Sequence, residues 1–511
     1  MKKRSKAAFA ALAAAIVFSA CGNGAQKSAQ NTQDAAGEKA AAIADGGDFS
    51  FGIATELNNF DPFDSGTAES RAVNFNIFEG LVKVAQDGGF VPAIAESWTI
   101  SDDAKVYTFA LRKAVKFHNG KTVDSDDVLY SIQTAIDSKL NGFSEIESFK
   151  IDGENLVITL KNANAGFIAY LTSAIVPKDY DGNARNPVGT GPFKFAEFAE
   201  QDHVKLVRND DYWGEKAHLD SVTVKFVASQ ANLVISFQSG SIDGFSAEAG
   251  TVMQLDENSL NRFESNSNAV QLIALNNDFE PFKDVRVRQA LNYLVDRQEI
   301  IDTVNYGSGV IVGSGLIPAL SKYFDETLGA AYSLKDNVEK AKALLSEAGY
   351  ADGFSFTITV PSVYTVHVDT AAVVVNELAK AGIRAEIKQV DWATWLSSVY
   401  KGRQYEATII SLDGALAYPT AFLSRYESKA GNNFVNFKSD AYDAVYAQAV
   451  STVDDGEKVD LFKKCQQILS QEAASVFLQD ISEFTVYNKH FAGYKGYPLY
   501  ARDFSAIYKV D

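Results

Sequence analysis

Two carboxylates stand at positions where a ligand could be held: Asp413 and Asp480. Residues 407–411 form a short apolar run typical of a buried strand, and Asp413 follows that run closely. Ligands of parallel sheets bind beyond the carboxyl ends of the strands, so we expect Asp413 at the lip of a crevice. Asp480 ends a second apolar run, 475–478. Such carboxylates can hold a cationic group through charge-assisted hydrogen bonds.

Patterns of catalytic and metal-binding residues are missing from the sequence. It contains no Gly-x-Ser-x-Gly elbow, no phosphate-binding Gly-x-x-x-x-Gly-Lys loop and no His-Glu-x-x-His helix. The five histidines lack the spacing of metal ligands; they are His118, His203, His218, His367 and His490. The sequence therefore predicts a protein that is not an enzyme and that carries no cofactor and no metal.

The first residues have the order of a secretory signal peptide. A basic start that includes Lys2 and Arg4 precedes the uncharged, mostly apolar run 7–20, and Cys21 follows Ser19-Ala20. The run is shorter than the roughly 20 residues of a spanning helix. Small residues before a cysteine are similar to the bacterial lipobox, whose cysteine is diacylated, with palmitate for example. We expect residues 1–20 to be removed and Cys21 to anchor the chain to the outer face of the cytoplasmic membrane; ordinary cleavage without lipid is the alternative.

Composition limits the structure of the chain beyond Cys21. Residues 21–47 are rich in Ala, Gly, Gln, Asn and Ser and have no apolar period, which predicts a flexible tether. The remaining chain is too long for a single core, so we expect two or three domains. A formal net charge of -18 argues against nucleic acid and anionic lipid surfaces as partners and favours, weakly, a cationic ligand.

The C-terminal half alternates strands and helices. Apolar and alternating runs predict strands at 354–360, 383–387 and 407–411, with a helix over 369–381 and a helical stretch around Trp395. Right-handed crossovers between such strands give a parallel sheet, so the fold class is α/β. Cys465 shares an apolar helical face with its neighbours and is predicted to be a buried core thiol.

Ordered phrases along most of the chain carry a family resemblance. They are Val91-Pro92-Ala93-Ile94-Ala95-Glu96-Ser97-Trp98, Val115-Lys116-Phe117-His118-Asn119-Gly120, Val188-Gly189-Thr190-Gly191-Pro192-Phe193, Arg208-Asn209-Asp210-Asp211-Tyr212-Trp213-Gly214, Val285-Arg286-Val287-Arg288-Gln289-Ala290-Leu291-Asn292-Tyr293 and Ala348-Gly349-Tyr350. Together they resemble the extracellular solute-binding proteins of ABC importers that take dipeptides, oligopeptides or nickel. The resemblance covers roughly residues 48 to 500.

The resemblance implies a two-lobed periplasmic-binding-protein fold with a hinge between the lobes. Lobe I would comprise 48–81, 186–275 and 481–511, with an extra subdomain inserted at 82–185, and lobe II would comprise 276–480. The protein would be a monomer that closes on a small solute or peptide and delivers it to the membrane permease subunits of the importer.

The ligand stays open at this stage. Peptide binders of this family hold the ligand's amino group with an aspartate whose position is occupied here by Ala415, and an arginine that they carry is Val399 here. The nickel branch resembles this chain at Gly414-Ala415 but lacks its marker residues here. Trp392 matches a cleft tryptophan of the family's peptide binders, where it would add a hydrophobic wall or a cation–π contact. We therefore take Asp413, Asp480 and Trp392, with Gly414 and Ala415 beside them, as the candidate ligand-binding residues. A peptide or other amine-bearing solute is the first expectation. The alternatives are a sugar oligomer, a metal chelate or, less favoured, an adhesive or hydrolytic surface protein.

Overall fold

The structure, a computed structural model, describes residues 43–64, 67–333, 337–414 and 416–510. The predicted signal peptide at 1–20, Cys21, residues 21–42 of the predicted tether and Ala415 lie outside the described residues.

The folded body begins before the predicted end of the tether. Ile43–Ala44 forms β1, which pairs antiparallel with β20 (Tyr508–Val510), and the backbone N–H of Gly46 donates to the carbonyl of His218 at 2.8 Å. The expectation that the tether runs to residue 47 is therefore corrected. A Gly- and Ala-rich composition does not reveal a short strand whose partner lies at the other end of the chain.

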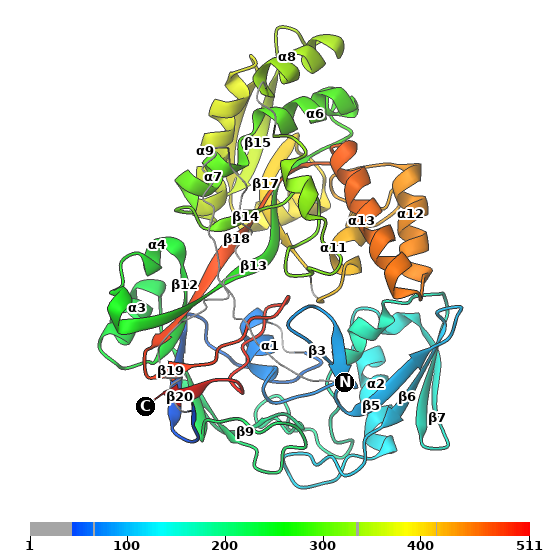
Figure 1. The fold of residues 1–511 in the computed structure, drawn as a ribbon, viewed down its shortest axis with the longest axis vertical. Coiled ribbons are helices and arrows are strands. Elements are labelled where there is room, and N and C mark those ends of the chain that lie inside the picture. The colour runs from blue at the N-terminus through cyan, green and yellow to red at the C-terminus, as the bar shows by residue number, and fades with distance from the viewer. Residues whose placement is uncertain (1–42, 65–66, 334–336, 415, 511) are drawn as a thin grey trace, which may run out of the picture. The chain divides into compact units, whose positions relative to one another are not determined.

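One mixed sheet of eleven strands organises the described residues (Figure 1). Its order is β16 (Arg384–Val390), β15 (Ser355–Pro361), β17 (Ala407–Asp413), β13 (Leu260–Leu275), β18 (Val476–Asn488), β12 (Gly244–Glu248), β2 (Asp48–Ile53), β11 (Ser221–Phe226), β10 (His203–Arg208) and β9 (Phe193–Ala199), with β14 (Gly309–Ile311) paired to β18.

The predicted parallel strand–helix unit is confirmed. β15 pairs parallel with both β16 and β17, and α9 (Thr365–Ala379) connects β15 to β16. The helix begins four residues before the predicted start at 369, which brings residues 365–368 into its first turn. The stretch around Trp395 is α10 (Trp392–Thr394), which continues as a π-helical segment, Trp395–Lys401.

Two long strands cross the sheet together. β13 and β18 pair antiparallel from Leu260↔Asn488 to Ile273↔Val476, and the register shifts between Asn266 and Val270. The C-terminal half of β18 also pairs with β12, whereas the C-terminal half of β13 also pairs with β17. β13 and β18 therefore connect two parts of the sheet (Figure 1). One part runs from β12 to β9 in the sheet order, and the other contains β17, β15 and β16.

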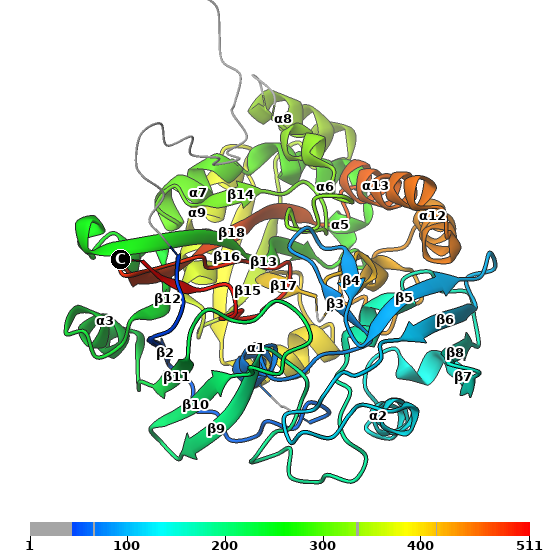
Figure 2. The same cartoon turned by 60° about the horizontal axis from the view of Figure 1, so that its bottom comes forward.

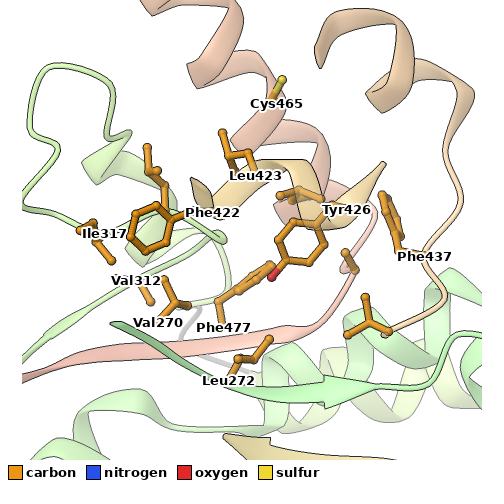
Figure 3. Close-up of a cluster of buried hydrophobic side chains, with 14 of the residues drawn as sticks. Val270, Leu272, Val312, Ile317, Phe422, Leu423, Tyr426, Phe437, Cys465 and Phe477 are labelled. Carbon is orange, nitrogen blue, oxygen red and sulfur yellow. The ribbon is translucent and has the colours of Figure 1, made fainter. Parts of the chain in front are cut away.

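Helices cover the sheet around β15 and β17 and bury two apolar cores. The helices are α5 (Glu280–Lys283), α6 (Val285–Leu294), α7 (Arg297–Val304), α8 (Asn337–Glu347), α9, α11 (Thr420–Leu423), α12 (Asp440–Ser451) and α13 (Asp455–Gln471). In the larger core, Leu272 and Phe477 of the two long strands pack with Phe422, Tyr426 and Cys465 (Figure 3). Cys465 is fully buried, as predicted, and burial raises the pKa of its thiol to about 12.

A separate four-stranded antiparallel sheet lies earlier in the chain. Its order is β5 (Ala95–Ile100), β6 (Val106–Leu111), β8 (Asn155–Leu160) and β7 (Ile146–Asp152), and α2 (Ser125–Asp137) lies beside it (Figure 2). The remaining elements are α1 (Ala68–Asn74), α3 (Gln230–Gln238), α4 (Ala249–Val252), β3 (Val82–Val84), β4 (Phe90–Pro92), β19 (Phe491–Ala492) and short 3₁₀ turns at 143–145, 167–172, 257–259, 326–330 and 424–426.

Arg288 of α6 ties that helix to the end of α13. The guanidinium is buried and donates to four backbone carbonyls, those of Phe282 (2.7 Å), Glu472 (2.7 Å), Ala473 (3.0 Å) and Lys283 (3.2 Å). Burial lowers the pKa of Arg288 to about 10. Its five donors match carbonyl groups that would otherwise be buried without partners.

We predict that Arg288→Met destabilises the protein by about 3–5 kcal/mol, because the carbonyls lose donors and remain buried. Urea unfolding measures the change through the midpoint of the transition. The matched control is Arg286→Met, two residues away on the same helix, whose guanidinium is partly exposed and pairs with Asp284 at 2.6 Å; its unfolding midpoint should stay close to that of the native protein. Equal losses for the two variants would contradict this role of Arg288.

Candidate functional site

A cavity of about 710 Å³ lies against the paired strands β13 and β18. One part of its wall comes from the end of β12 and from α4. Another part comes from the end of α7, the start of α9, Trp392 and the end of β17. The two long strands contribute the residues between these parts, at Ser267, Ala269 and 481–483. The cavity is therefore formed by both groups of elements that β13 and β18 join.

The charge of the lining has one sign. Four carboxylates line the cavity, those of Glu248, Asp369, Asp413 and Glu483, and among the lining residues that the structure describes none is a lysine or an arginine. His367 is the remaining titratable base there, and burial lowers its pKa to about 4, so that it is neutral at neutral pH. An empty cavity of this kind attracts cations and repels anions.

Glu483 lies where the cavity meets a second, smaller one. The neighbouring cavity, of about 230 Å³, shares Glu248 and Glu483 with the first and is also lined by Arg502. Burial raises the pKa of Glu483, Arg502 opposes that shift, and Glu69 and Glu248 add to it. The Arg502 guanidinium is already bound by Glu69 at 3.0 Å, by the hydroxyl of Tyr500 and by Ser246. Arg502 is therefore engaged within the protein and is poorly placed to bind a ligand carboxylate.

Trp392 contributes an aromatic ring to the lining of the cavity. It is 38 % exposed. Its ring stacks on Trp395 at 5.1 Å with an interplanar angle of 5°, and Tyr364 packs edge-on against it at 5.5 Å. The indole N–H of Trp395 donates to Thr408 at 2.9 Å. This packing fixes the orientation of the exposed Trp392 ring.

Asp413 ends β17 at the cavity, whereas Gly414, the next residue, is not among the lining residues. Asp413 is the last residue of β17, its side chain is exposed, and it lines the cavity. Its carbonyl accepts a hydrogen bond from Arg425 at 2.8 Å. A Cβ on Gly414 would lie 2.4 Å from the ring of Phe422, so this position is a close packing contact. Ala415 is outside the described residues, and its predicted place in the site stays a prediction.

Asp480 has a different position from the one expected. It is fully buried, its Oδ1 accepts from Ser267 Oγ at 2.9 Å and from Ala269 N at 3.3 Å, and its Oδ2 has no hydrogen-bond partner among the described residues. Ser267 and Ala269 line the cavity and cover the carboxylate. Asp480 therefore supports the irregular part of β13, where Asn268 has a φ of 58°, and the structure does not place it in the lining.

Several lining residues were missed when site residues were sought in the sequence at the ends of apolar runs. Glu483 belongs to β18, while Glu248 and Asp369 lie at the junction of β12 with α4 and within α9. His367 lies in the first turn of α9, ahead of the predicted helix start. The only available signal was that polar residues follow the carboxyl ends of predicted strands; their distance from Asp413 along the chain gave no hint of proximity.

Metal-binding and membrane-spanning features can be stated for the described residues. No group of three or more His, Cys, Asp or Glu residues is arranged there to hold a metal ion. In the same part of the chain, no helix has the length and hydrophobicity needed to cross a bilayer.

Comparison with known proteins agrees with this architecture. Heme-binding protein A of Haemophilus influenzae is 29% identical over 467 residues, which cover 82% of this chain and 83% of that protein. The structure of the ABC transporter-associated periplasmic binding protein DppA from Helicobacter pylori, in complex with the peptide STSA, is 28% identical with a TM-score of 0.70, covering 92% and 99% of the two chains. AgaA of Agrobacterium tumefaciens R10, in complex with agropinic acid, is 29% identical with a TM-score of 0.71, covering 91% and 99%.

Two strands that join two sets of elements beside a cavity are the architecture of a two-lobed periplasmic binding protein, and the structural neighbours have that fold. The profile of the family described as "Bacterial extracellular solute-binding proteins, family 5 Middle" matches residues 89–434, more than half of the chain. The chain belongs to family 5 of the bacterial extracellular solute-binding proteins, the receptors of ABC importers.

The buried carboxyl of Asp480 predicts a pH dependence of stability. Burial raises its pKa to about 7, above the value of about 3.9 in an unfolded chain. The protonated Asp480 carboxyl therefore contributes to the free energy of unfolding. This contribution is fully present below about pH 4 and is lost as the pH rises to about 7. Between pH 5 and pH 8 this group alone should lower the stability of the native protein by about 2–3 kcal/mol.

Asp480→Asn should remove that part of the pH dependence, as measured by urea unfolding at both pH values. Asp413→Asn is the matched control, because the Asp413 side chain is exposed; it should retain the native difference. If Asp480→Asn and the native protein lose equal stability between pH 5 and pH 8, Asp480 is not the responsible group.

Proposed function

We propose that this protein is the lipid-anchored receptor of an ABC importer for a peptide or other amine-bearing solute. The single observation that carries the choice of ligand is that, among the residues the structure describes, the cavity is lined by four carboxylates and by no lysine or arginine. A positively charged group placed there forms charge-assisted hydrogen bonds, whereas an anion is repelled. The names of the relatives, which include di/tripeptide-binding and dipeptide-binding proteins, support a peptide-like ligand.

The roles of the lining residues follow from their positions. Asp413 and Asp369 are proposed to bind the cation from one side, Glu248 and Glu483 from the other, and Trp392 to cover an apolar part of the ligand. Asp480, the other anchor expected from the sequence, acts instead by holding the β13 segment that carries Ser267 and Ala269. Catalysis is not part of this function.

The lobes are proposed to follow the expected boundaries. Lobe I would contain 48–81, 186–275 and 481–511, with the subdomain 82–185 inserted, and lobe II would contain 276–480. With these limits, the proposed boundaries at 275/276 and 480/481 fall at the C-terminal end of β13 and within β18. Ligand would favour the closed arrangement by contacting both lobes at once.

Anchoring is tested at Cys21. Cys21→Ala should release the protein from the membrane fraction, because acylation would lose its thiol while the folded body is unchanged. Detergent-free fractionation of cells measures the distribution, and Cys465→Ala, which alters a thiol buried in the core, is the control that should stay with the membrane. Retention of the Cys21→Ala protein in the membrane fraction would show that the anchor lies elsewhere.

Ligand capture is tested by calorimetry with a mixture of short basic peptides and, separately, a mixture of neutral sugar oligomers. The peptide mixture should bind, and at 100 times the dissociation constant a bound peptide should raise stability by about 2.7 kcal/mol. Asp413→Asn and Glu483→Gln should each weaken binding roughly 10- to 150-fold, the value of one charge-assisted bond.

Glu386→Gln is the matched control, because Glu386 is an exposed carboxylate of β16 that does not line the cavity. It should leave the affinity unchanged. Binding of sugar oligomers alone, or equal peptide affinity for all three variants, would overturn the proposed amine ligand.

A further inference from the structure

His367 combines nearly complete burial with a position on the cavity wall. It lies in the first turn of α9, is 4 % exposed, and lines the cavity. Its ring has two nitrogen atoms, and a neutral imidazole carries its proton on one of them. Which nitrogen carries the proton decides whether His367 presents a donor or an acceptor to a ligand.

The neighbours of His367 determine the tautomer. Gln479 Nε2 donates to Gln271 Oε1 at 2.8 Å. The other terminal atom of the Gln271 carboxamide is therefore its nitrogen, Nε2. That nitrogen lies 3.0 Å from His367 Nδ1 and 3.1 Å from the hydroxyl of Thr370. The Thr370 hydroxyl donates its own proton to the carbonyl of Val366 at 2.7 Å, so it must accept from Gln271.

With the Gln271 and Gln479 amides in these orientations, each polar hydrogen of the Gln479–Gln271–Thr370–His367 chain of contacts has one position. The two N–H groups of Gln271 point to Thr370 and to His367 Nδ1, and Nδ1 is therefore an acceptor without a proton. The proton of the neutral ring is on Nε2. The hydrogen bond that the ring makes with the described residues is at Nδ1 and leaves Nε2 unengaged, and His367 is a lining residue, so its Nε2–H is available to a ligand.

A second buried donor lines the same cavity. Asn305, at the end of α7, is 6 % exposed, and its Nδ2 is buried without a hydrogen-bond partner in the described part of the chain. Buried donors of this kind are costly unless they are paired in some state of the protein. His367 and Asn305 are both uncharged donors that can bind a neutral carbonyl or a carboxylate, so the four carboxylates of the lining decide between these acceptors.

We propose that the cavity selects a cationic ligand without a free carboxylate, and that His367, held as the Nε2–H tautomer by Gln271, donates to a neutral acceptor of that ligand, such as a carboxamide or peptide carbonyl. This inference rests on the proposed function of the cavity as the solute site. A ligand carboxylate would face Glu248, Asp369, Asp413 and Glu483 with no lysine or arginine in the described lining to balance it. Such uncompensated charges act against binding.

The first measurement needs no ligand. A long-range ¹H–¹⁵N spectrum of the full folded domain at neutral pH, with His367→Gln for assignment, reports the protonation of each ring nitrogen. We expect His367 to be neutral with the proton on Nε2. A proton on Nδ1, or a doubly protonated ring, would overturn the inference whatever ligand the protein binds.

The second measurement compares two probes by calorimetry: the dipeptide Lys-Ala as its free acid and as its carboxamide. The carboxamide should bind roughly 10- to 100-fold more tightly to the native protein, the effect of one unpaired buried polar group or more. His367→Phe keeps a ring but removes the donor, and it should weaken carboxamide binding roughly 10-fold. His367→Gln, whose amide nitrogen reaches the position of Nε2, should stay within about 3-fold of the native protein.

The outcomes separate the inference from the proposed function. Binding of the free acid as tightly as the carboxamide would overturn the selection against a carboxylate, and equal affinities for His367→Phe and the native protein would overturn the role of His367; neither result touches amine capture. Failure of both dipeptides to bind the native protein would count against amine capture itself, and the tautomer measurement would still decide the state of His367.

Discussion

The hydrogen-bonded pairing of β13 with β18 is the interaction on which the rest of the structure depends. The two strands run together from Leu260↔Asn488 to Ile273↔Val476. At one end β18 pairs with β12, and at the other β13 pairs with β17. Because both strands also line the cavity, the site is built on the longest strand pairing among the described residues. Any rearrangement of the two sides must be absorbed by this pair.

The middle of the β13–β18 pair is polar, unlike the apolar cores on either side of it. Gln271, Gln479 and Asp480 are buried there, and Gln479 Oε1 and Asp480 Oδ2 have no hydrogen-bond partner among the described residues. Each such atom costs roughly 1–3 kcal/mol. Apolar residues of similar size would make this part of the strand pair more stable. Amides and a carboxyl can instead exchange hydrogen-bond partners. Local cost of this kind is typical of functional positions.

Sequence patterns predicted the parts of the structure that local rules determine. The parallel order of β15, β16 and β17, the burial of Cys465 and the position of Asp413 at a strand end follow from apolar periodicity and strand ends, whereas Trp392 was chosen from the family resemblance. The position of Asp480 did not follow, because the register of β13 shifts beside it and an irregular segment covers its carboxylate. Glu248, Glu483 and His367 meet only through the tertiary fold, and nothing local connects them.

The distribution of acidic residues links binding to conformation. Glu248 and Glu483 belong to one end of the long strands, and Asp369 and Asp413 to the elements around the other end. Bringing these carboxylates together without a ligand raises their mutual repulsion, and Arg502 cannot relieve it because Glu69 already holds it. In the proposed function, a cation between the two pairs would convert that repulsion into attraction and would stabilise the closed arrangement more than the open one. Differential stabilisation of this kind is what allows a solute to drive closure, and a neutral or anionic solute of equal size would lack it.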